Sequence, residues 1–447
     1  MKNNVVICDA NHGGLVLLDE YSKYTSQPLF FYDIYNKLTD EDKKTYSQKY
    51  NVSFIEKESI DESYTTIAPV HMRPVIHKDF THHEFTSYLV NKHRNKYNWN
   101  FRIIQVTGVK AKTTVTSMIK DILSDYNVLV LNSSELSYNS DNRKVVLKRN
   151  LSITPSSIIT ALNIALEEDL LDKIDYFIAE VSLGVIPNES IGVLTNIVED
   201  YPIADDSLKA SAAKRNVFSC DRVICMKESF DKYYDDVKKD AFKISLADAD
   251  SDLYTSKLNL DIKNSSFTLH YNDKKYDITC FALTDFYVLN ILFAISVGLM
   301  CDMCMKDILL KIEDINTIDG RTSYKKVGKK IIIEEINPGL NTTSIKKSIE
   351  NIKRLDENFI IVLGGDYGIT CEEIDETKLV NYLKTLPNKI VLTGNLGRNI
   401  HGKLNKSNIT YIPALNKAIK EMLKLENNEI IEVIYRSEYA KNVELNI

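Results

Sequence analysis

The hydrophobic positions of this 447-residue chain form short runs that alternate with helix-like patterns over most of its length. Short apolar runs bounded by polar turn residues are typical of buried strands, and their alternation with helices predicts α/β units with mainly parallel sheets. In the first hundred residues, the runs that predict strands are VVICDA, PLFFYDIY and TTIAPV.

A polar stretch that ends at Asn100 predicts a boundary, and a second α/β block begins after it. Within this block, the segment KLNLDIKNSSFTLHYNDKKYDIT alternates polar and apolar residues and turns twice, which predicts an antiparallel ribbon. A helix from about residue 285 to 299 is expected to close the block. The predicted parallel strands of the block are RIIQVTG, YFIAEVS, IGVLTNIV and RVICMK.

A third block starts near Asp319 and Arg321. The pattern as a whole therefore predicts three consecutive α/β domains with mainly parallel sheets, at residues 1–100, 101–318 and 319–447. The predicted strands of the third block are KKIIIEEI, NFIIVLGG, KIVLTG, NITYI and EIIEVIY.

Composition narrows the class of protein. A charged content of 26% and a hydrophobic content of 44% are those of a globular chain. The net charge of −6, with no basic block, disfavours a nucleic-acid partner. No apolar run is long enough to span a membrane, no signal peptide is recognised, and the seven scattered cysteines fit reduced thiols. We therefore expect a cytoplasmic protein; its oligomeric state is not indicated.

The segment TGVKAKTTV, at residues 107–115, has the pattern of a phosphate-binding loop between a buried strand and a helix. Free backbone N–H groups and the dipole at a helix N-terminus attract phosphate, the Lys112 ammonium adds a positive charge, and a threonine hydroxyl can bind Mg²⁺. The alternative is a helix start that merely carries a lysine, because the loop is shorter than the GxxxxGK[ST] form. The expected nucleotide-contacting residues are Thr107, Gly108, Val109, Lys110, Ala111, Lys112, Thr113 and Thr114.

Ala111 stands where such loops usually have glycine. An alanine in the first turn of a helix can adopt ordinary helical angles, so we expect the sharp part of the turn to fall on Gly108. On this interpretation Gly108→Ala weakens ATP binding far more than Ala111→Gly.

Glu180 ends a predicted strand, at the edge of the sheet where open α/β sheets bind ligands. A carboxylate there can hold Mg²⁺ opposite the loop hydroxyl. Without the loop, an exposed strand-end glutamate is the simpler interpretation.

Together these motifs resemble the Mur ligase family, whose members use ATP to activate a carboxylate as an acyl phosphate. The resemblance covers the second and third predicted domains and implies an ATP-dependent ligase that uses Mg²⁺. It implies that Lys214, in ASAAKRNVF, is the lysine that many members carbamylate to hold a second Mg²⁺. The family's metal-binding histidine is absent, since TNIVED runs on into Tyr201, and Asp200 is expected to replace it. The resemblance also implies nucleotide contacts from Asn290, Arg321 and either Glu334 or Glu335.

Several segments are most similar to one branch of the family, the coenzyme F-430 synthetases of methanogenic archaea. This resemblance implies a nickel-containing seco-tetrapyrrole acid as the substrate, with the nickel carried by the substrate and not by the protein. ATP would activate a propionate-derived carboxylate, and a ring carbon would attack it to close a six-membered carbocyclic ring. The segments that carry the resemblance are TGVKAKTT, NLSITPSSIITAL, AEVSLG, KASAAK and INPGLN.

Six of the eight histidines fall in the first hundred residues. His12 and His71 each follow a predicted strand of the same sheet, and His82 and His83 begin a predicted helix. With Arg73, these histidines are expected to face the carboxylates of the tetrapyrrole. The pattern leaves open whether one of them ligates nickel or whether they only cap loops.

Two other functions are compatible with parts of this pattern. An amide-forming Mur-type ligase of archaeal pseudomurein synthesis would need a site for a UDP-linked substrate, and no clear GxGxxG is present. A non-catalytic ATP-binding protein would not need Lys112, Thr113, Glu180 and Lys214 together.

Overall fold

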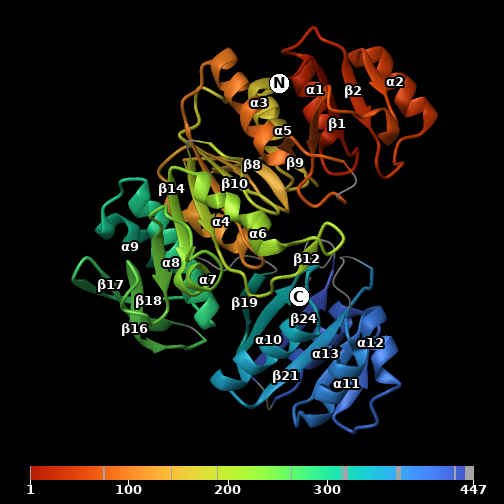
Figure 1. Ribbon diagram of the computed structural model, residues 1–447. Coiled ribbons are helices and arrows are strands. Elements are labelled where there is room, and N and C mark those ends of the chain that lie inside the picture. The colour runs from red at the N-terminus through yellow and green to blue at the C-terminus, as the bar shows by residue number, and fades with distance from the viewer. Residues whose placement is uncertain are drawn as a thin grey trace. The chain divides into compact units, whose positions relative to one another are not determined.

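The computed structural model describes residues 2–73, 76–141, 143–188, 190–262, 264–313, 315, 321–368, 374–426 and 429–437, with only the backbone described at 321–324. Its sheets are mostly parallel and alternate with helices, which confirms the predicted α/β class (Figure 1). The chain divides into two compact units. The first comprises Met1–Ser256, Leu269–Tyr276 and Leu289–Ile312; the second comprises Lys257–Thr268, Asp277–Val288 and Glu313–Ile447. The finer division into three domains stays a prediction.

The first sheet of unit 1 has five strands in the order β3-β2-β1-β4-β5, and every neighbouring pair is parallel. The three predicted strands are present, and the short strands β3 and β5 are additional. Because β1 and β4 are parallel neighbours, the segments that follow them leave the same edge of the sheet. The strands are β1 (Asn4–Cys8), β2 (Leu29–Tyr32), β3 (Val52–Phe54), β4 (Tyr64–Ala68) and β5 (Phe80–Thr81).

Three helices accompany this sheet: α1 (Gly14–Ser22), α2 (Asp40–Tyr50) and α3 (His82–Tyr97). The start of α3 is set by a capping box, in which the Thr81 side chain accepts from the Glu84 N–H and the Glu84 carboxylate accepts from the Thr81 N–H. His82 and His83 therefore begin the helix, as predicted.

An eleven-stranded sheet follows, in the order β18-β17-β16-β15-β14-β11-β6-β10-β7-β8-β9. At its centre, β6 (Arg102–Thr107) lies between β10 (Tyr176–Glu180) and β11 (Ser190–Leu194), and both pairings are parallel. Three carboxyl ends therefore meet at one edge of the sheet. The other strands are β7 (Val128–Leu131), β8 (Glu135–Ser140), β9 (Arg143–Arg149), β14 (Arg222–Met226), β15 (Phe242–Ser245), β16 (Leu253–Asn259), β17 (Ser265–Tyr271) and β18 (Lys274–Cys280).

The two ends of this sheet differ in how well the sequence predicts them. Strands β16, β17 and β18 coincide with the predicted ribbon. The parallel strands β7 and β15 were not predicted, nor were the antiparallel strands β8 and β9, which extend the sheet beyond β7. A separate two-stranded ribbon joins β12 (Pro202–Ile203) to β13 (Leu208–Lys209).

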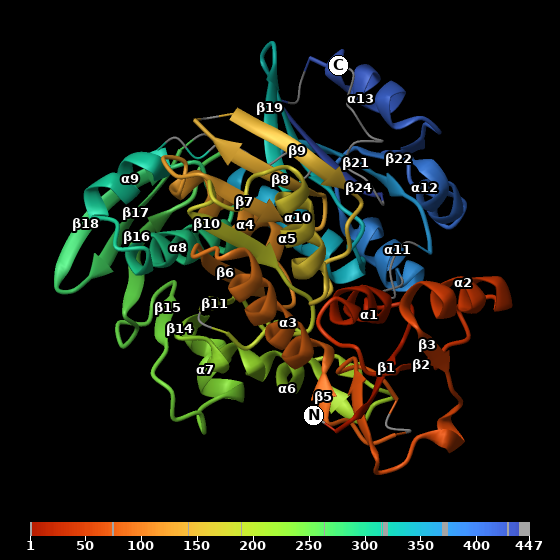
Figure 2. The same cartoon turned by 90° about the horizontal axis from the view of Figure 1, so that it is seen from above.

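Within unit 1, one apolar core joins the first sheet to the central strands of the eleven-stranded sheet. Helices α1, α3 and α5 (Ser157–Glu167) pack on one another, as both views show (Figures 1 and 2). Leu17, Phe85 and Ile158, one from each helix, are fully buried in the same cluster. Because this core is continuous, residues from both sheets can line a common cavity. The remaining helices before the third sheet are α4 (Lys112–Ile122), α6 (Ala210–Lys214), α7 (Lys227–Tyr233), α8 (Asp285–Met300) and α9 (Met305–Glu313).

The third sheet, in unit 2, has six strands in the order β19-β20-β24-β21-β22-β23. All neighbours are parallel except β19 and β20, and β19 was not among the predicted strands. No helix in the described part of the chain is long and apolar enough to cross a membrane. The elements are β19 (Arg321–Val327), β20 (Lys330–Ile336), β21 (Phe359–Gly365), β22 (Ile390–Thr393), β23 (Ile409–Tyr411), β24 (Ile430–Arg436), α10 (Thr342–Leu355), α11 (Glu376–Thr385), α12 (Gly394–His401) and α13 (Leu415–Leu423).

Candidate functional site

The phosphate loop, residues 108–111, connects β6 to α4 at the carboxyl edge of the central sheet. Gly108 has φ 145°, and a Cβ at this position would lie 2.0 Å from Thr195 Oγ1. Ala111 caps α4 with φ 68° and ψ 1°, in the left-handed region. The expectation of ordinary helical angles at Ala111 was therefore wrong: the loop turns at both residues, and the alanine takes on backbone strain where glycine would have none.

Residues after β11 fix the shape of the loop. The N–H of Val109 donates to the Asn196 carbonyl oxygen at 3.0 Å, and the N–H of Lys110 donates to Asn196 Oδ1 at 3.1 Å. Thr195 Oγ1 donates to the Lys110 carbonyl oxygen at 2.7 Å. Sequence reasoning missed the role of Thr195 and Asn196, although their place at the end of a predicted strand next to the loop strand was the available signal.

Glu180 and Thr113 come together as predicted. Thr113 Oγ1 donates to Glu180 Oε2 at 2.9 Å, and both side chains are buried. The Ser133 N–H also donates to Glu180 Oε2, at 3.1 Å, and the Ser133 and Thr113 hydroxyl oxygens are 3.1 Å apart. A buried carboxylate beside hydroxyl oxygens is an all-oxygen donor set, so these residues fit a Mg²⁺ ion.

Two lysines add positive charge near the loop. Lys112 Nζ donates to the carbonyl oxygens of Gly108 and Val109, at 3.3 and 3.5 Å, so its ammonium lies over the loop. Lys214, the last residue of α6, is 1% exposed. Burial, reinforced by the charge of Lys112 and opposed by Asp200, lowers the pKa of Lys214 to about 7. A substantial fraction of Lys214 is therefore a neutral amine at neutral pH.

The Asp200 carboxylate caps α6. Its two oxygens accept from the Ser211 N–H and the Ser211 hydroxyl, both at 2.8 Å. Its negative charge acts on Lys214 and opposes the lowering of the Lys214 pKa, and a role for Asp200 as a ligand of a second Mg²⁺ stays a prediction. Asn290 lies in α8 and is 8% exposed, and no hydrogen bond indicates what its side chain contacts.

The remaining predicted nucleotide contacts belong to unit 2. Glu334 is buried in β20 and pairs with Lys325 Nζ at 3.1 Å. Asn337 Nδ2 donates to Glu335 Oε1 at 2.5 Å. Arg321 begins β19, but its side chain lies outside the described residues. Roles for these residues at the nucleotide stay predictions.

A cavity of about 230 Å³ in unit 1 brings the N-terminal histidines together, and we call it the histidine cavity. It is smaller than the range of about 300–1,000 Å³ usual for small-molecule sites, so it can hold one arm of a large ligand. Its wall combines segments of both sheets of unit 1. The lining residues are His12, Pro69, Val70, His71, His82, His83, Thr154, Pro155, Ser182 and Leu183.

The histidines of the cavity differ in their partners. His82 Nε2 donates to the Cys8 carbonyl oxygen at 3.0 Å, and His83 Nε2 donates to the Ser182 carbonyl oxygen at 3.0 Å. His71 Nε2 is buried and has no hydrogen-bond partner. Burial lowers the pKa of His71, His82 and His83 to about 4, so all three are neutral at physiological pH. They offer lone pairs or single N–H groups and not positive charges.

Arg73, expected beside these histidines, does not line the cavity. It forms an exposed ion pair with Asp205, at 3.0 Å, in the turn between β12 and β13. Whether it contacts substrate stays a prediction.

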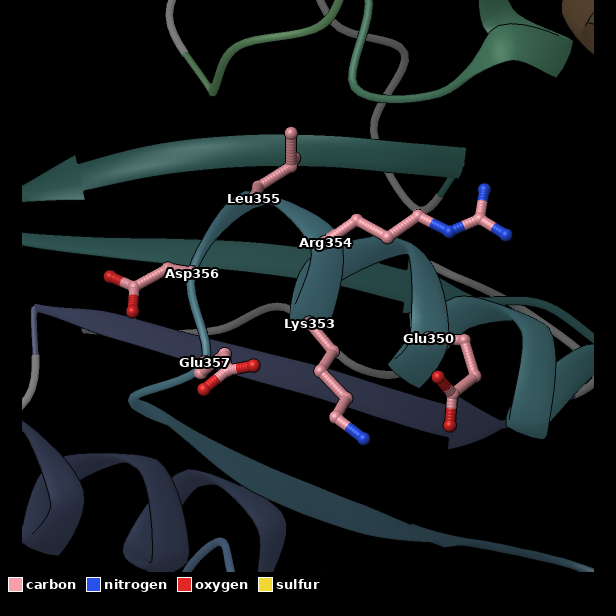
Figure 3. Close-up of a pocket in the computed structure, with 6 residues that line it drawn as sticks. All are labelled: Glu350, Lys353, Arg354, Leu355, Asp356 and Glu357. Carbon is pink, nitrogen blue, oxygen red and sulfur yellow. The ribbon is translucent and has the colours of Figure 1, made fainter.

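A second hollow, of about 360 Å³, lies at the C-terminal end of α10 (Figure 3). Charged side chains, among them Glu350, Lys353 and Arg354, surround it and point in different directions. Because these groups do not converge on one point and no strand end contributes to it, this hollow is not a candidate for the chemical site.

Comparisons with known proteins bear on the family and the fold of the chain. Residues 324–438 match the family described as coenzyme F430 synthetase CfbE, C-terminal domain. The coenzyme F(430) synthetase of Methanocaldococcus jannaschii is 30% identical over 414 residues, which cover 90% of this chain and 93% of that protein. The coenzyme F(430) synthetase of Methanosarcina acetivorans is 22% identical over 471 residues, covering 96% of this chain and 97% of that protein.

Among solved structures, the MurF ligase of Thermotoga maritima in complex with ADP superposes with a TM-score of 0.58 at 12% identity. The alignment covers 95% of this chain and 94% of that one. At this identity the likeness concerns the fold, which is that of the Mur ligases.

Proposed function

The chain belongs to the coenzyme F430 synthetase family and is an ATP-dependent ligase with the Mur ligase fold, and from this premise we propose which substrate it takes and which residues act on it. The substrate is a nickel-containing seco-tetrapyrrole acid, and the nickel ion is carried by this substrate and not by the protein. ATP phosphorylates one propionate-derived carboxylate, and a ring carbon of the same molecule then attacks the acyl phosphate.

The observation that carries this proposal is the convergence of Lys112, Thr113, Glu180 and Lys214 at one edge of the central sheet. A protein that only binds a nucleotide needs the loop and the helix N-terminus. It does not need a buried carboxylate that accepts a hydrogen bond from a hydroxyl at the end of the loop. It also does not need a buried lysine whose pKa is lowered to about 7. Both features suit an enzyme that transfers a phosphoryl group.

The chemistry requires phosphoryl transfer first. A carboxylate is a poor electrophile because its leaving group would be oxide, whereas an acyl phosphate expels inorganic phosphate. One carboxylate oxygen attacks the γ-phosphorus, and the bond between that phosphorus and ADP breaks. The ring carbon then forms a carbon–carbon bond to the acyl carbon and loses a proton, and phosphate leaves with the carboxylate oxygen that linked it. The products are the closed carbocyclic ketone, ADP and phosphate.

The residues of the loop stabilise charge during phosphoryl transfer. The Lys112 ammonium and the N–H groups at the start of α4 face the place where negative charge develops on the γ-phosphoryl oxygens. Thr113 and Glu180 would hold one Mg²⁺, and a carbamylated Lys214 together with Asp200 would hold a second. When bound, Mg²⁺ neutralises phosphate charge and aligns the oxygens.

Lys214 has the property that carbamylation demands. Carbon dioxide reacts with a neutral amine and not with an ammonium group, and burial keeps part of Lys214 neutral near pH 7. The modification would convert the neutral amine into an anionic carbamate, with release of one proton, and so create a metal ligand where the family's histidine is missing.

The position of the histidine cavity supports binding of the substrate there. Its residues Ser182 and Leu183 directly follow β10, two and three residues after Glu180. A substrate arm in the cavity would therefore have its carboxylate close to the end of β10, where Glu180 lies. The serine and threonine hydroxyls of the cavity would hold it by hydrogen bonds, because the N–H groups of the neutral His82 and His83 already donate to backbone carbonyls.

Release of ADP tests the proposal. The purified protein is incubated with Mg-ATP and either the nickel seco-tetrapyrrole acid or a UDP-linked acceptor with an amino acid. We expect release of ADP, and a change in the absorption spectrum, only with the tetrapyrrole. Release only with the UDP-linked substrate would instead identify a pseudomurein-type ligase, and release with neither would contradict an enzyme of either kind.

A further inference from the structure

The strongest unexplained feature of unit 1 is the group formed by Asp9, His12 and His71 at the wall of the histidine cavity. One potential ligand atom from each residue lies within 4.8 Å of the other two. The His12 and His71 rings meet edge to face, with centroids 4.3 Å apart. Neither nucleotide binding nor phosphoryl transfer uses these three side chains, so their convergence requires another explanation.

Local structure holds the three residues in place. Asp9 is fully buried, adopts φ 75°, and accepts from the Asn11 N–H at 2.8 Å. His12 Nδ1 lies 2.5 Å from the second carboxylate oxygen of Asp9. The loop before His71 is held by Lys78 Nζ, which donates to the carbonyl oxygen of Val70 at 3.2 Å.

His71 supplies the observation that points to a ligand. Its Nε2 is buried and has no hydrogen-bond partner, although a buried polar atom normally has one. The neighbouring His82 and His83 both direct a ring nitrogen to a backbone carbonyl. A cation between His71, His12 and Asp9 would satisfy the orphaned nitrogen.

We propose that Asp9, His12 and His71 bind a divalent first-row transition cation such as Zn²⁺ or Co²⁺. Two imidazole nitrogens and one carboxylate oxygen form a borderline donor set, which favours these ions over Mg²⁺. Ligand atoms around one tetrahedral ion lie about 3 to 3.5 Å apart, for bond lengths of about 2.0–2.1 Å, so small side-chain rotations complete the site. Binding of the ion replaces the hydrogen bond between His12 Nδ1 and the Asp9 carboxylate.

The same geometry argues against direct ligation of the substrate's nickel. A nickel ion held by four ring nitrogens offers one axial position on each face, so three convergent protein donors cannot bind it together. A cation that is not held by a tetrapyrrole can bind all three donors and still has one coordination position open. That position would face the cavity, where a carboxylate of the bound ligand would occupy it.

Binding of Zn²⁺ to the full-length protein, by equilibrium dialysis with excess Mg²⁺ to fill the oxygen sites, tests this proposal. We expect one Zn²⁺ per chain, and His12→Gln or His71→Gln to weaken binding at least about tenfold. The matched control is His77→Gln, because His77 is 84% exposed and lies outside the group. The His77 variant is expected to bind like the wild type.

Two further measurements keep the test decisive if a histidine variant is unstable. Asp9→Asn removes the charge yet keeps a residue that tolerates positive φ, so it is expected to fold and to bind Zn²⁺ more weakly. The absorption of bound Co²⁺ in the wild type is expected to report nitrogen and oxygen ligands. The proposed site would be overturned if the wild type bound no Zn²⁺. It would also be overturned if the double variant His12→Gln/His71→Gln bound Zn²⁺ as tightly as the wild type. Neither ATP nor tetrapyrrole is present, so the result is independent of the proposed function.

Discussion

The phosphate loop and the histidine cavity both lie beyond the carboxyl ends of parallel strands, but they differ in how many sheets supply their residues. The loop is completed by Glu180, the last residue of β10, and by Thr195 and Asn196 after β11, and both strands pair with β6 in one sheet. The cavity joins His12 and His71, which follow strands of the first sheet, to Thr154 and Ser182 of the central block. The loop is therefore a property of one sheet, whereas the cavity requires the core that joins two.

The two regions also differ in charge. Near the loop, Lys112 lies over the backbone that would receive phosphate, and Lys214 is charged only in part. In the cavity, burial keeps His71, His82 and His83 neutral. We infer that the loop acts by electrostatic stabilisation and that the cavity acts by hydrogen bonding and ligation.

Lys112→Ala is expected to have the largest effect. Loss of one preorganised charged donor from a phosphoryl-transfer site lowers kcat by about 10²–10³-fold, because the developing charge is no longer stabilised. Lys120→Ala is the matched control, since Lys120 lies near the end of the same helix and pairs with Asp121 at 2.8 Å. The measurement is the rate of ADP release; equal rates for the two variants would show that the loop is misassigned.

Gly108→Ala and Ala111→Gly separate the two turning points of the loop. The added Cβ at residue 108 would meet Thr195 Oγ1 at 2.0 Å, at a φ of 145°. Strain of about 1–3 kcal/mol at this position corresponds to an ATP affinity lowered by up to about 100-fold. Ala111→Gly relieves a left-handed alanine and is expected to raise stability by about 1 kcal/mol. Titration with ATP and thermal unfolding measure the two effects, and similar losses of affinity would contradict this difference.

Lys214→Met tests the lowered pKa of the buried lysine. Between pH 7 and about 10.5 the unfolded chain holds a proton on Lys214 that the folded chain lacks, so this lysine adds stability as pH rises through that window. Relative to Lys214→Met, the wild type should gain on the order of 3–4 kcal/mol in unfolding free energy between pH 7 and pH 10. Denaturant unfolding in carbon dioxide-free buffer at pH 7 and pH 10 provides the measurement. A constant difference would mean that Lys214 is charged in the folded chain.

His82→Phe tests whether the cavity wall depends on hydrogen bonds from neutral histidines. The variant leaves the Cys8 carbonyl without its donor, which is expected to cost about 1 to 2 kcal/mol of stability. His77→Phe is the control, because an exposed substitution usually changes stability by less than about 0.5 kcal/mol. Urea denaturation compares the two, and an equal effect would remove the structural role assigned to His82.

The sequence predicted the fold and the loop region well for a physical reason. Strands such as β6, β10 and β11 are buried on both faces, so they appear as continuous apolar runs that end at the residues of the site. Thr113 and Glu180 could be paired because parallel strands leave one edge of the sheet together. Strand β9 was missed because most of its residues are exposed, and β8 because only its first half is buried, whereas β7 is fully buried but only four residues long.

Other features depend on tertiary structure and could not be predicted from pattern. The angles of Ala111 follow from the hydrogen bonds that Asn196 makes to the loop, and no local preference of alanine favours them. His82 has a hydrogen-bond partner and His71 Nε2 has none, and this difference arises from packing between segments far apart in the chain. The same holds for Asp9, whose proximity to His71 depends on the pairing of β1 with β4.

The fate of a carboxylate oxygen shows whether ATP activates the acid as an acyl phosphate. The nickel seco-tetrapyrrole acid, labelled with ¹⁸O in its propionate-derived carboxylate, is converted with unlabelled Mg-ATP, and the phosphate released is analysed by mass spectrometry. The account predicts one ¹⁸O atom in each phosphate formed, because the leaving group carries the carboxylate oxygen that attacked ATP. Phosphate without label, at a yield equal to that of the product, would contradict it.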